Sequence, residues 1–185
     1  MKKPLNTLLI ILAVLTLSGV GSIVRAQQAN HQASENSRQG SDYTLPYPGI
    51  LPDNPLYPLK MIRDKIVSIF ISDPLKKAEF NLLMADKRIN SGKYLKDKQN
   101  FSLVESTISK GQNYLEQAIE VVIREKSQGK DISVIANRIN KASLKHEEVI
   151  KEIEAAAPES LKTGLRNALE RTKQAQEKIK TLLKK

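Results

Sequence analysis

The sequence predicts an all-α protein, an elongated up-and-down bundle of about five helices that follows a proline-rich lead-in. Three observations support this prediction. Apolar residues recur in steps of three and four, the spacing that places them on one face of a helix. No run alternates apolar and polar residues, as a half-buried strand would. Proline, glycine and helix-capping residues divide this pattern into five segments.

The first 26 residues have the parts of an export signal. Lys2 and Lys3 form a basic start, and an apolar run follows at residues 8–17. Small residues then lead to Ala26, which suits cleavage after that position. Alternatively, residues 8–24 are retained as an N-terminal anchor, since 17 residues are at the short limit of a membrane span. Both readings predict an extracytoplasmic protein, either secreted or anchored in the cytoplasmic membrane.

Two segments without regular helix are expected next. Residues 27–43 are rich in Gln, Asn, Ser and Gly, so they are predicted to form a disordered leader. Residues 44–60 contain five prolines, which favour extended and turn conformations. We expect Leu51, Leu56 and Tyr57 of this lead-in to pack on the bundle. The lead-in and the helices, residues 44–185, have the length of one domain.

The first two helices are separated by Asp73 and Pro74. The first is predicted from Pro58 to Ile71, and the second continues to about Lys98. Asp is a good N-cap and Pro suits the first helical position, so this pair should start the second helix. The predicted apolar stripe of the first helix is Leu59, Ile62, Ile66 and Ile69 or Phe70. That of the second is narrow and contains Leu75, Ala78, Leu82, Ala85, Ile89 and Gly92.

Three further helices complete the bundle. Ser102 and Glu105 have the spacing of a capping box, which predicts the start of the third helix, and Gly129 suits its end near Ser127. The fourth runs from Asp131 to Ala156, and the fifth from Pro158 to the C-terminus. The apolar stripe of the third helix is Val104, Ile108, Gly111, Leu115, Ala118 and Val122. That of the fourth is Ile132, Ile135, Ile139, Ala142, His146, Ile150 and Ile153. That of the fifth is Leu161, Leu165, Ala168, Leu169, Ala175, Ile179 and Leu182.

Two details of these helices bear on packing and on membranes. Gly92 and Gly111 lie within apolar stripes, where glycine lowers helix propensity, so they are candidates for close helix crossings. For Gly92 the equal alternative is a glycine that the helix merely tolerates. The fifth helix carries eight basic residues, and such a helix can lie on an anionic membrane. Its apolar face lacks Phe and Trp, so we interpret it instead as a bundle helix with a solvated basic face.

Few residues suit metal binding or proton transfer. Without Cys, the chain offers no disulfide, thiolate ligand or thiol nucleophile. His31 falls in the predicted leader, which leaves His146 as the one histidine of the helices. Ser143 stands where a ferritin-like site would have its paired Glu. We therefore interpret His146 as a partly buried histidine at the edge of a packed stripe.

No catalytic, cofactor-binding or metal-binding residue is predicted. Acids on different helices, such as Glu79, Asp86, Glu116 and Glu120, have no spacing that predicts paired carboxylates. Phosphate-binding glycine loops and nucleophile elbows are absent from the sequence, as are basic patches interleaved with aromatic residues. The sequence therefore predicts a non-enzyme without a cofactor and without a nucleic-acid partner.

The charge balance indicates what kind of partner to expect. Without residues 1–26 the chain has 27 basic and 20 acidic side chains, a net charge of +7. Partners outside the membrane are proteins or anionic envelope surfaces, that is, lipid head groups or cell-wall polymers. The predicted function is an exported, non-enzymatic binding or structural module. The alternatives are a periplasmic-type chaperone or stress sensor, and a metal- or carboxylate-dependent enzyme.

Residues 51–89 resemble a known family. The lead-in reads LPDNPLYPLK and is followed by DPLKKAEFNLLMADKR. This pattern is similar to that of a bacterial domain-of-unknown-function family, which is frequent in candidate-phylum bacteria and predicted to be extracytoplasmic and helical. The matching residues are Pro52, Pro55, Tyr57, Lys60, Asp73, Pro74, Lys76, Lys77, Ala78, Glu79, Ala85, Lys87 and Arg88. The resemblance implies a fold and a location, and it supplies no catalytic residue.

Overall fold

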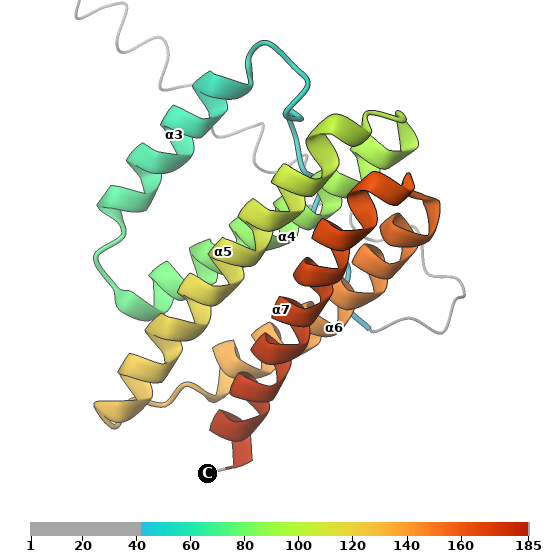
Figure 1. Cartoon of the computed structure of the whole chain (residues 1–185). Helices are drawn as coiled ribbons and strands as arrows, with labels where there is room; N and C mark the ends of the chain where they lie inside the picture. Colours follow the sequence, from blue (N-terminus) through green and yellow to red (C-terminus); the bar gives the residue numbers. More distant parts are fainter. Residues whose placement is uncertain (1–41, 185) are drawn as a thin grey trace, which may run out of the picture. The chain divides into compact units, whose positions relative to one another are not determined.

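The computed structural model describes residues 42–184, so the predicted export segment and most of the predicted leader lie outside the described residues. Five helices follow one another in this part of the chain, and it contains no strand. They are α3 (Tyr57–Phe70), α4 (Pro74–Asp97), α5 (Phe101–Ser127), α6 (Ser133–Ala156) and α7 (Glu159–Lys184) (Figure 1). The prediction of an all-α bundle of five helices is confirmed.

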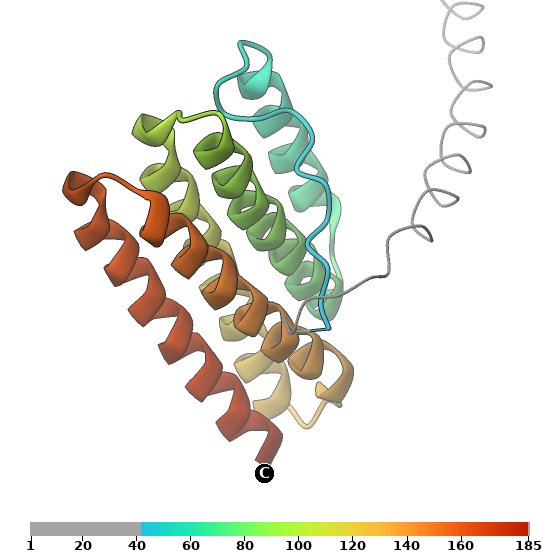
Figure 2. The same ribbon diagram turned by 90° about the vertical axis from the view of Figure 1, so that its right-hand side faces the viewer.

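Helices α4 to α7 enclose the core. The most extensive packing is between α4 and α5, and α7 joins α5 to α6; Figure 2 shows the four helices side by side. Successive helices run antiparallel, because each of two buried clusters combines opposite halves of neighbouring helices. One cluster includes Leu82, Val122, Ile135 and Ile179, and the other includes Ile89, Ile108, Ile150 and Leu165. The predicted stripes of these four helices therefore face the core.

Gly92 and Gly111 lie where α4 and α5 approach each other. A Cβ atom at Gly92 would overlap the side chain of Ile108, and one at Gly111 would lie 3.1 Å from Cβ of Arg88. A larger residue at Gly92 would displace the end of the Ile108 side chain, and one at Gly111 would press on atoms close to the α4 backbone. The prediction that these glycines mark close helix crossings is confirmed.

The capping box predicted at Ser102 does not form. Helix α5 begins at Phe101, and the Ser102 hydroxyl donates to Oδ1 of Asn100 at 2.9 Å. The reason is the short connection after α4. Gln99 adopts a positive φ of 59°, and the Asn100 N–H donates to the Leu95 carbonyl, so the chain turns at once into α5. The corresponding turn after α5 uses Gly129, as predicted, with a φ of 78°.

Helix α4 begins at the predicted N-cap. The Asp73 carboxylate accepts a hydrogen bond from the Lys76 N–H at 2.9 Å, and Pro74 occupies the first turn. Asp73→Ala should lower the free energy of unfolding by about 0.5 to 2 kcal/mol, because it leaves this N–H without its partner. Asp73→Asn should cost distinctly less, since Asn also caps. Urea denaturation of both variants tests this, and equal losses would contradict it.

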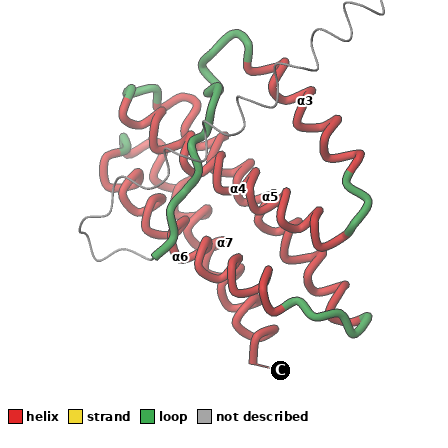
Figure 3. The backbone as a smooth tube through the Cα atoms, turned by 180° about the vertical axis from the view of Figure 1, so that it is seen from behind, coloured by secondary structure: helices red, strands yellow, loops and turns green. Residues whose placement is uncertain are grey.

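The lead-in runs beside α4 in the same chain direction. Asn90 Nδ2 donates to the Pro46 carbonyl at 2.9 Å, and Tyr47 packs edge-on against Tyr94 with ring centroids 6.1 Å apart. Further along, Lys98 Nζ pairs with Asp53 at 2.9 Å. Figure 3 shows this segment as a loop beside the helices, before the chain turns back into α3. The packing predicted for Leu56 is wrong, since its side chain is 54% exposed.

Candidate functional site

Helix α3 turns a polar face toward the bundle. Lys60 and Asp64, one helical turn apart, are its two buried residues. Nζ of Lys60 donates to the carbonyls of Pro48 at 2.7 Å and Ile50 at 3.1 Å, so the lead-in satisfies this buried ammonium. Burial lowers the pKa of Lys60 below its ordinary value. Near the end of α3, Nζ of Lys77 donates to the carbonyl and the hydroxyl of Ser68.

The apolar face of α3 points to solvent. Its large side chains are 49 to 80% exposed, and they form what we call the α3 outer face: Leu59, Ile62, Ile66, Ile69 and Phe70. The stripe predicted for this helix is indeed one of its faces, but it faces solvent and is not packed against the other helices of the bundle. The polar contacts of Lys60 and Lys77 fix α3 in the opposite orientation. None of the helices in residues 42–184 has the length and apolarity needed to span a membrane.

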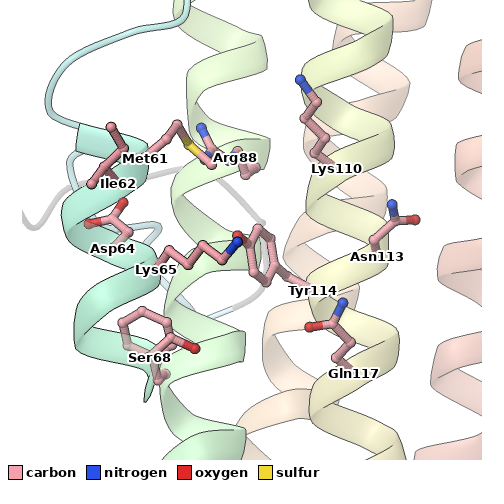
Figure 4. A pocket seen from close by; sticks show the side chains of 11 residues that line it. Met61, Ile62, Asp64, Lys65, Ser68, Arg88, Lys110, Asn113, Tyr114 and Gln117 are labelled. Carbon is pink, nitrogen blue, oxygen red and sulfur yellow. The ribbon is translucent and has the colours of Figure 1, made fainter. Parts of the chain in front are cut away.

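A cavity of about 600 Å³ lies between α3 and the α4–α5 pair (Figure 4). We call it the α3 cavity. Its walls mix apolar and basic side chains with Asp64, and Lys65 of α3 extends toward Tyr114 of α5 (Figure 4). The lining residues are Met61, Ile62, Asp64, Lys65, Ser68, Phe80, Arg88, Lys110, Asn113, Tyr114 and Gln117. This volume is within the range of small-molecule sites in proteins.

Arg88 is the buried cation of this cavity. Its side chain is 2% exposed, and its guanidinium lies 5.0 Å from the ring centre of Tyr57. Nη2 contacts the sulfur of Met61, while Nη1 has no hydrogen-bond partner among the described residues. Burial lowers the pKa of Arg88, and the Tyr114 hydroxyl partly offsets this effect. A buried charge without a paired anion is costly, so this arrangement favours an external anionic partner.

Asp64 is the carboxylate of the same cavity. Oδ1 accepts from Nε of Arg63 at 3.1 Å and from Nη2 of Arg63 at 2.7 Å. Oδ2 is buried and has no partner within the described residues. The cavity therefore holds an acceptor as well as a cation, and with Lys65 and Lys110 its basic side chains outnumber this acid.

His146 lies in the interior of the bundle. It is fully buried, and Nε2 is 2.7 Å from Oδ1 of Asp86, which is 1% exposed. A carboxylate can only accept, so Nε2 donates this hydrogen bond. The hydroxyl of Tyr43 donates to Oδ2 of the same carboxylate at 2.6 Å. The sequence predicted a partly buried histidine at the edge of a packed stripe, and the structure corrects this to full burial, because its buried partner lies on a different helix.

This Tyr43–Asp86–His146 network connects the residue just before the lead-in with α4 and α6. Burial and then the Asp86 carboxylate raise the pKa of Tyr43 above its ordinary value. None of the three side chains lines the α3 cavity. Tyr43, the last residue of the predicted leader, is thus held against the core. Within the described part of the chain, no three His, Asp or Glu side chains converge as metal ligands would.

The other candidate acids do not join Asp86. Glu79 pairs with Lys76 on its own helix, and Glu116 accepts from Nε and Nη2 of Arg171 on α7, both at 2.9 Å. This pairing lowers the pKa of Glu116. Glu120 lines a small groove beside Glu116 and Arg171. Within residues 42–184, only Glu116 of these acids joins two helices, and none of them pairs with another carboxylate.

Arg88 was not predicted as a site residue. It precedes Ile89 of the apolar stripe by one position, so a helical wheel places it at the edge of the buried face of α4. This position could have drawn attention to Arg88, because an arginine there either extends its guanidinium group away from the core or is enclosed by another element. Only the position of α3 determines that it is enclosed.

Comparison with known proteins agrees with the expected family of unknown function. A family model, described as domain of unknown function DUF5667, matches residues 49–160. The match extends from the lead-in through α6 and includes every residue that lines the α3 cavity. Searches of curated proteins and of solved structures gave no match. Since the family model covers more than half of the sequence, the chain belongs to the DUF5667 family of domains of unknown function.

Proposed function

We propose that this domain is an exported, non-enzymatic binding module that attaches to the anionic lipid surface of the cell envelope through the α3 outer face. The observation that carries this proposal is the exposure of five large apolar side chains on one face of one helix. Exposed apolar patches of this kind mark protein or membrane interaction sites. The remaining helices bury their apolar stripes, so α3 alone offers such a face within residues 42–184.

Charge supports a lipid surface as the partner. Arg63 of α3 is exposed beside the outer face, where its long side chain can reach phosphate groups while the apolar residues enter the acyl boundary. The net charge of +7 without residues 1–26 favours an anionic surface over a neutral one. A second copy of α3 in this place would bring two Arg63 side chains together. The predicted export segment delivers the chain to the outer side of the cytoplasmic membrane, where such lipids are present.

Helix α7 is less suited to this role. Its apolar residues, Leu165, Ala168, Ala175 and Ile179 among them, are buried in the bundle. Membrane insertion of that face would require the bundle to open. This packing supports the interpretation of α7 as a bundle helix with a solvated basic face.

The test is binding of the chain from Gln27 to Lys185, which contains the whole described core, to phospholipid vesicles. Ile66→Ser combined with Phe70→Ser should lower affinity for phosphatidylglycerol vesicles at least about tenfold, since burying each side chain contributes roughly 1.5 to 3 kcal/mol. Flotation on a density gradient measures this. Helix content and the unfolding midpoint should not change, because both side chains are exposed.

Val134→Ser is the matched control, because Val134 is 79% exposed on α6. It should leave vesicle binding unchanged. The proposal fails if the double variant binds as well as the unchanged chain, or if neutral phosphatidylcholine vesicles bind as tightly as anionic ones. A chaperone would use the same apolar face without preference for anionic lipid, so suppression of aggregation together with failed vesicle binding would favour that alternative.

A further inference from the structure

We propose that the α3 cavity is a binding site for a small amphiphilic anion, with a phosphate head group on Arg88 and an apolar body against Met61, Phe80 and Tyr114. This inference goes beyond membrane attachment, because it concerns a soluble ligand in a cavity between helices that opens to solvent. It rests on the cavity, the unpartnered guanidinium nitrogen and the mixed lining. Of the α3 outer face, only Ile62 also lines this cavity.

The head group is assigned by Arg88. Its guanidinium is fixed against Tyr57 and Met61 and keeps one nitrogen without a partner, although the side chain is almost fully buried. Planar guanidinium groups bind phosphate oxygens through paired hydrogen bonds. Lys65 and Lys110, both exposed and lining the same cavity, add positive charge at its edge. The cavity thus has a buried anchor and an attractive entrance for an anion.

The apolar side chains that line the cavity indicate that the ligand has an apolar body. Met61 of α3, Phe80 of α4 and Tyr114 of α5 line the cavity from three helices, so a short alkyl chain would find apolar surface around it. An inorganic anion would leave most of the volume of about 600 Å³ unused. Ligand sites of this size combine apolar walls with a few polar groups that fix orientation. The lining therefore favours an alkyl phosphate over free phosphate.

Substitution of Asp64 should change ligand affinity in the direction opposite to substitution of Arg88. Its carboxylate lines the cavity and repels an anion, and only Oδ1 is paired with Arg63. Asp64→Asn removes this repulsion and keeps the size of the side chain. Affinity for an alkyl phosphate should then rise several-fold, whereas Arg88→Met should lower it.

Calorimetric titration of the chain from Gln27 to Lys185 with hexyl phosphate tests the proposal. Inorganic phosphate and 1-hexanol, each carrying half of the ligand, should bind at least about tenfold more weakly. Arg88→Met should lower hexyl phosphate affinity at least about tenfold, as expected for a hydrogen-bonded charge. Its unfolding midpoint should stay equal or rise, because it removes a buried cation without a paired anion. Lys141→Met, which removes an exposed cation of α6, should change neither quantity.

Three results would overturn the proposal: no binding of hexyl phosphate at millimolar concentration, unchanged affinity in Arg88→Met, or equal affinity for inorganic phosphate. Should Arg88→Met fail to fold, the rise in affinity expected for Asp64→Asn decides the question. The vesicle experiment remains separate. Arg88→Met should still bind anionic vesicles, and the Ile66→Ser and Phe70→Ser double variant should still bind hexyl phosphate.

Discussion

Asp86→Ala should lower the free energy of unfolding by about 2 to 5 kcal/mol, since each group left without its hydrogen-bond partner inside the fold costs roughly 1 to 3 kcal/mol. The change leaves Nε2 of His146 and the hydroxyl of Tyr43 without the carboxylate that accepts from both. His146 cannot turn to water while the bundle stays folded, because it is fully buried, whereas Tyr43 is half-buried against the core. Urea denaturation followed by circular dichroism measures this loss.

Tyr43→Phe is the control for this network. It removes only one of the two hydrogen bonds to Asp86 and leaves the histidine pair intact, so the expected loss is about 0.5 to 1.5 kcal/mol. A loss for Asp86→Ala as small as that for Tyr43→Phe would mean that His146 and Asp86 do not form a buried pair in solution.

Leu82→Ala should lower the free energy of unfolding by about 2 to 5 kcal/mol. Leu82 is fully buried in the cluster that joins α4 to the other three core helices, so truncation leaves a void that rigid helices fill only in part. Leu144→Ala, at a position 40% exposed on α6, should cost much less. A loss below about 0.5 kcal/mol for Leu82→Ala would place this stripe in solvent.

The four core helices could be predicted because each has apolar residues at helical spacing and packs that face against the apolar face of another helix. Each stripe in α4 to α7 repeats at helical spacing, and each buries that face against another. Asp73 was equally predictable, since an N-cap depends on residues three positions apart. Local chemistry also suggested a capping box at Ser102, but the left-handed Gln99 before it determines where α5 begins.

The orientation of α3 could not be predicted in this way. Its periodicity is the same whether the apolar face meets protein or solvent, and the decisive contacts join Lys60 to carbonyls 10 and 12 residues earlier. The Asp86–His146 contact could not be predicted for a similar reason, because 60 residues separate the two side chains in the sequence. Periodicity identifies a face of a helix, whereas only tertiary structure shows what that face meets.

The attachment of the lead-in to α4 determines how the domain responds to mechanical force. Tension applied to the N-terminus reaches the domain first at Tyr43 and then at the contacts of Pro46 and Tyr47. A pull across the α4 axis breaks these contacts one after another, whereas a pull along the axis loads them together and meets greater resistance. In both directions we expect the lead-in and α3 to separate before the core, because they contact the bundle from outside while α4 to α7 share the buried clusters.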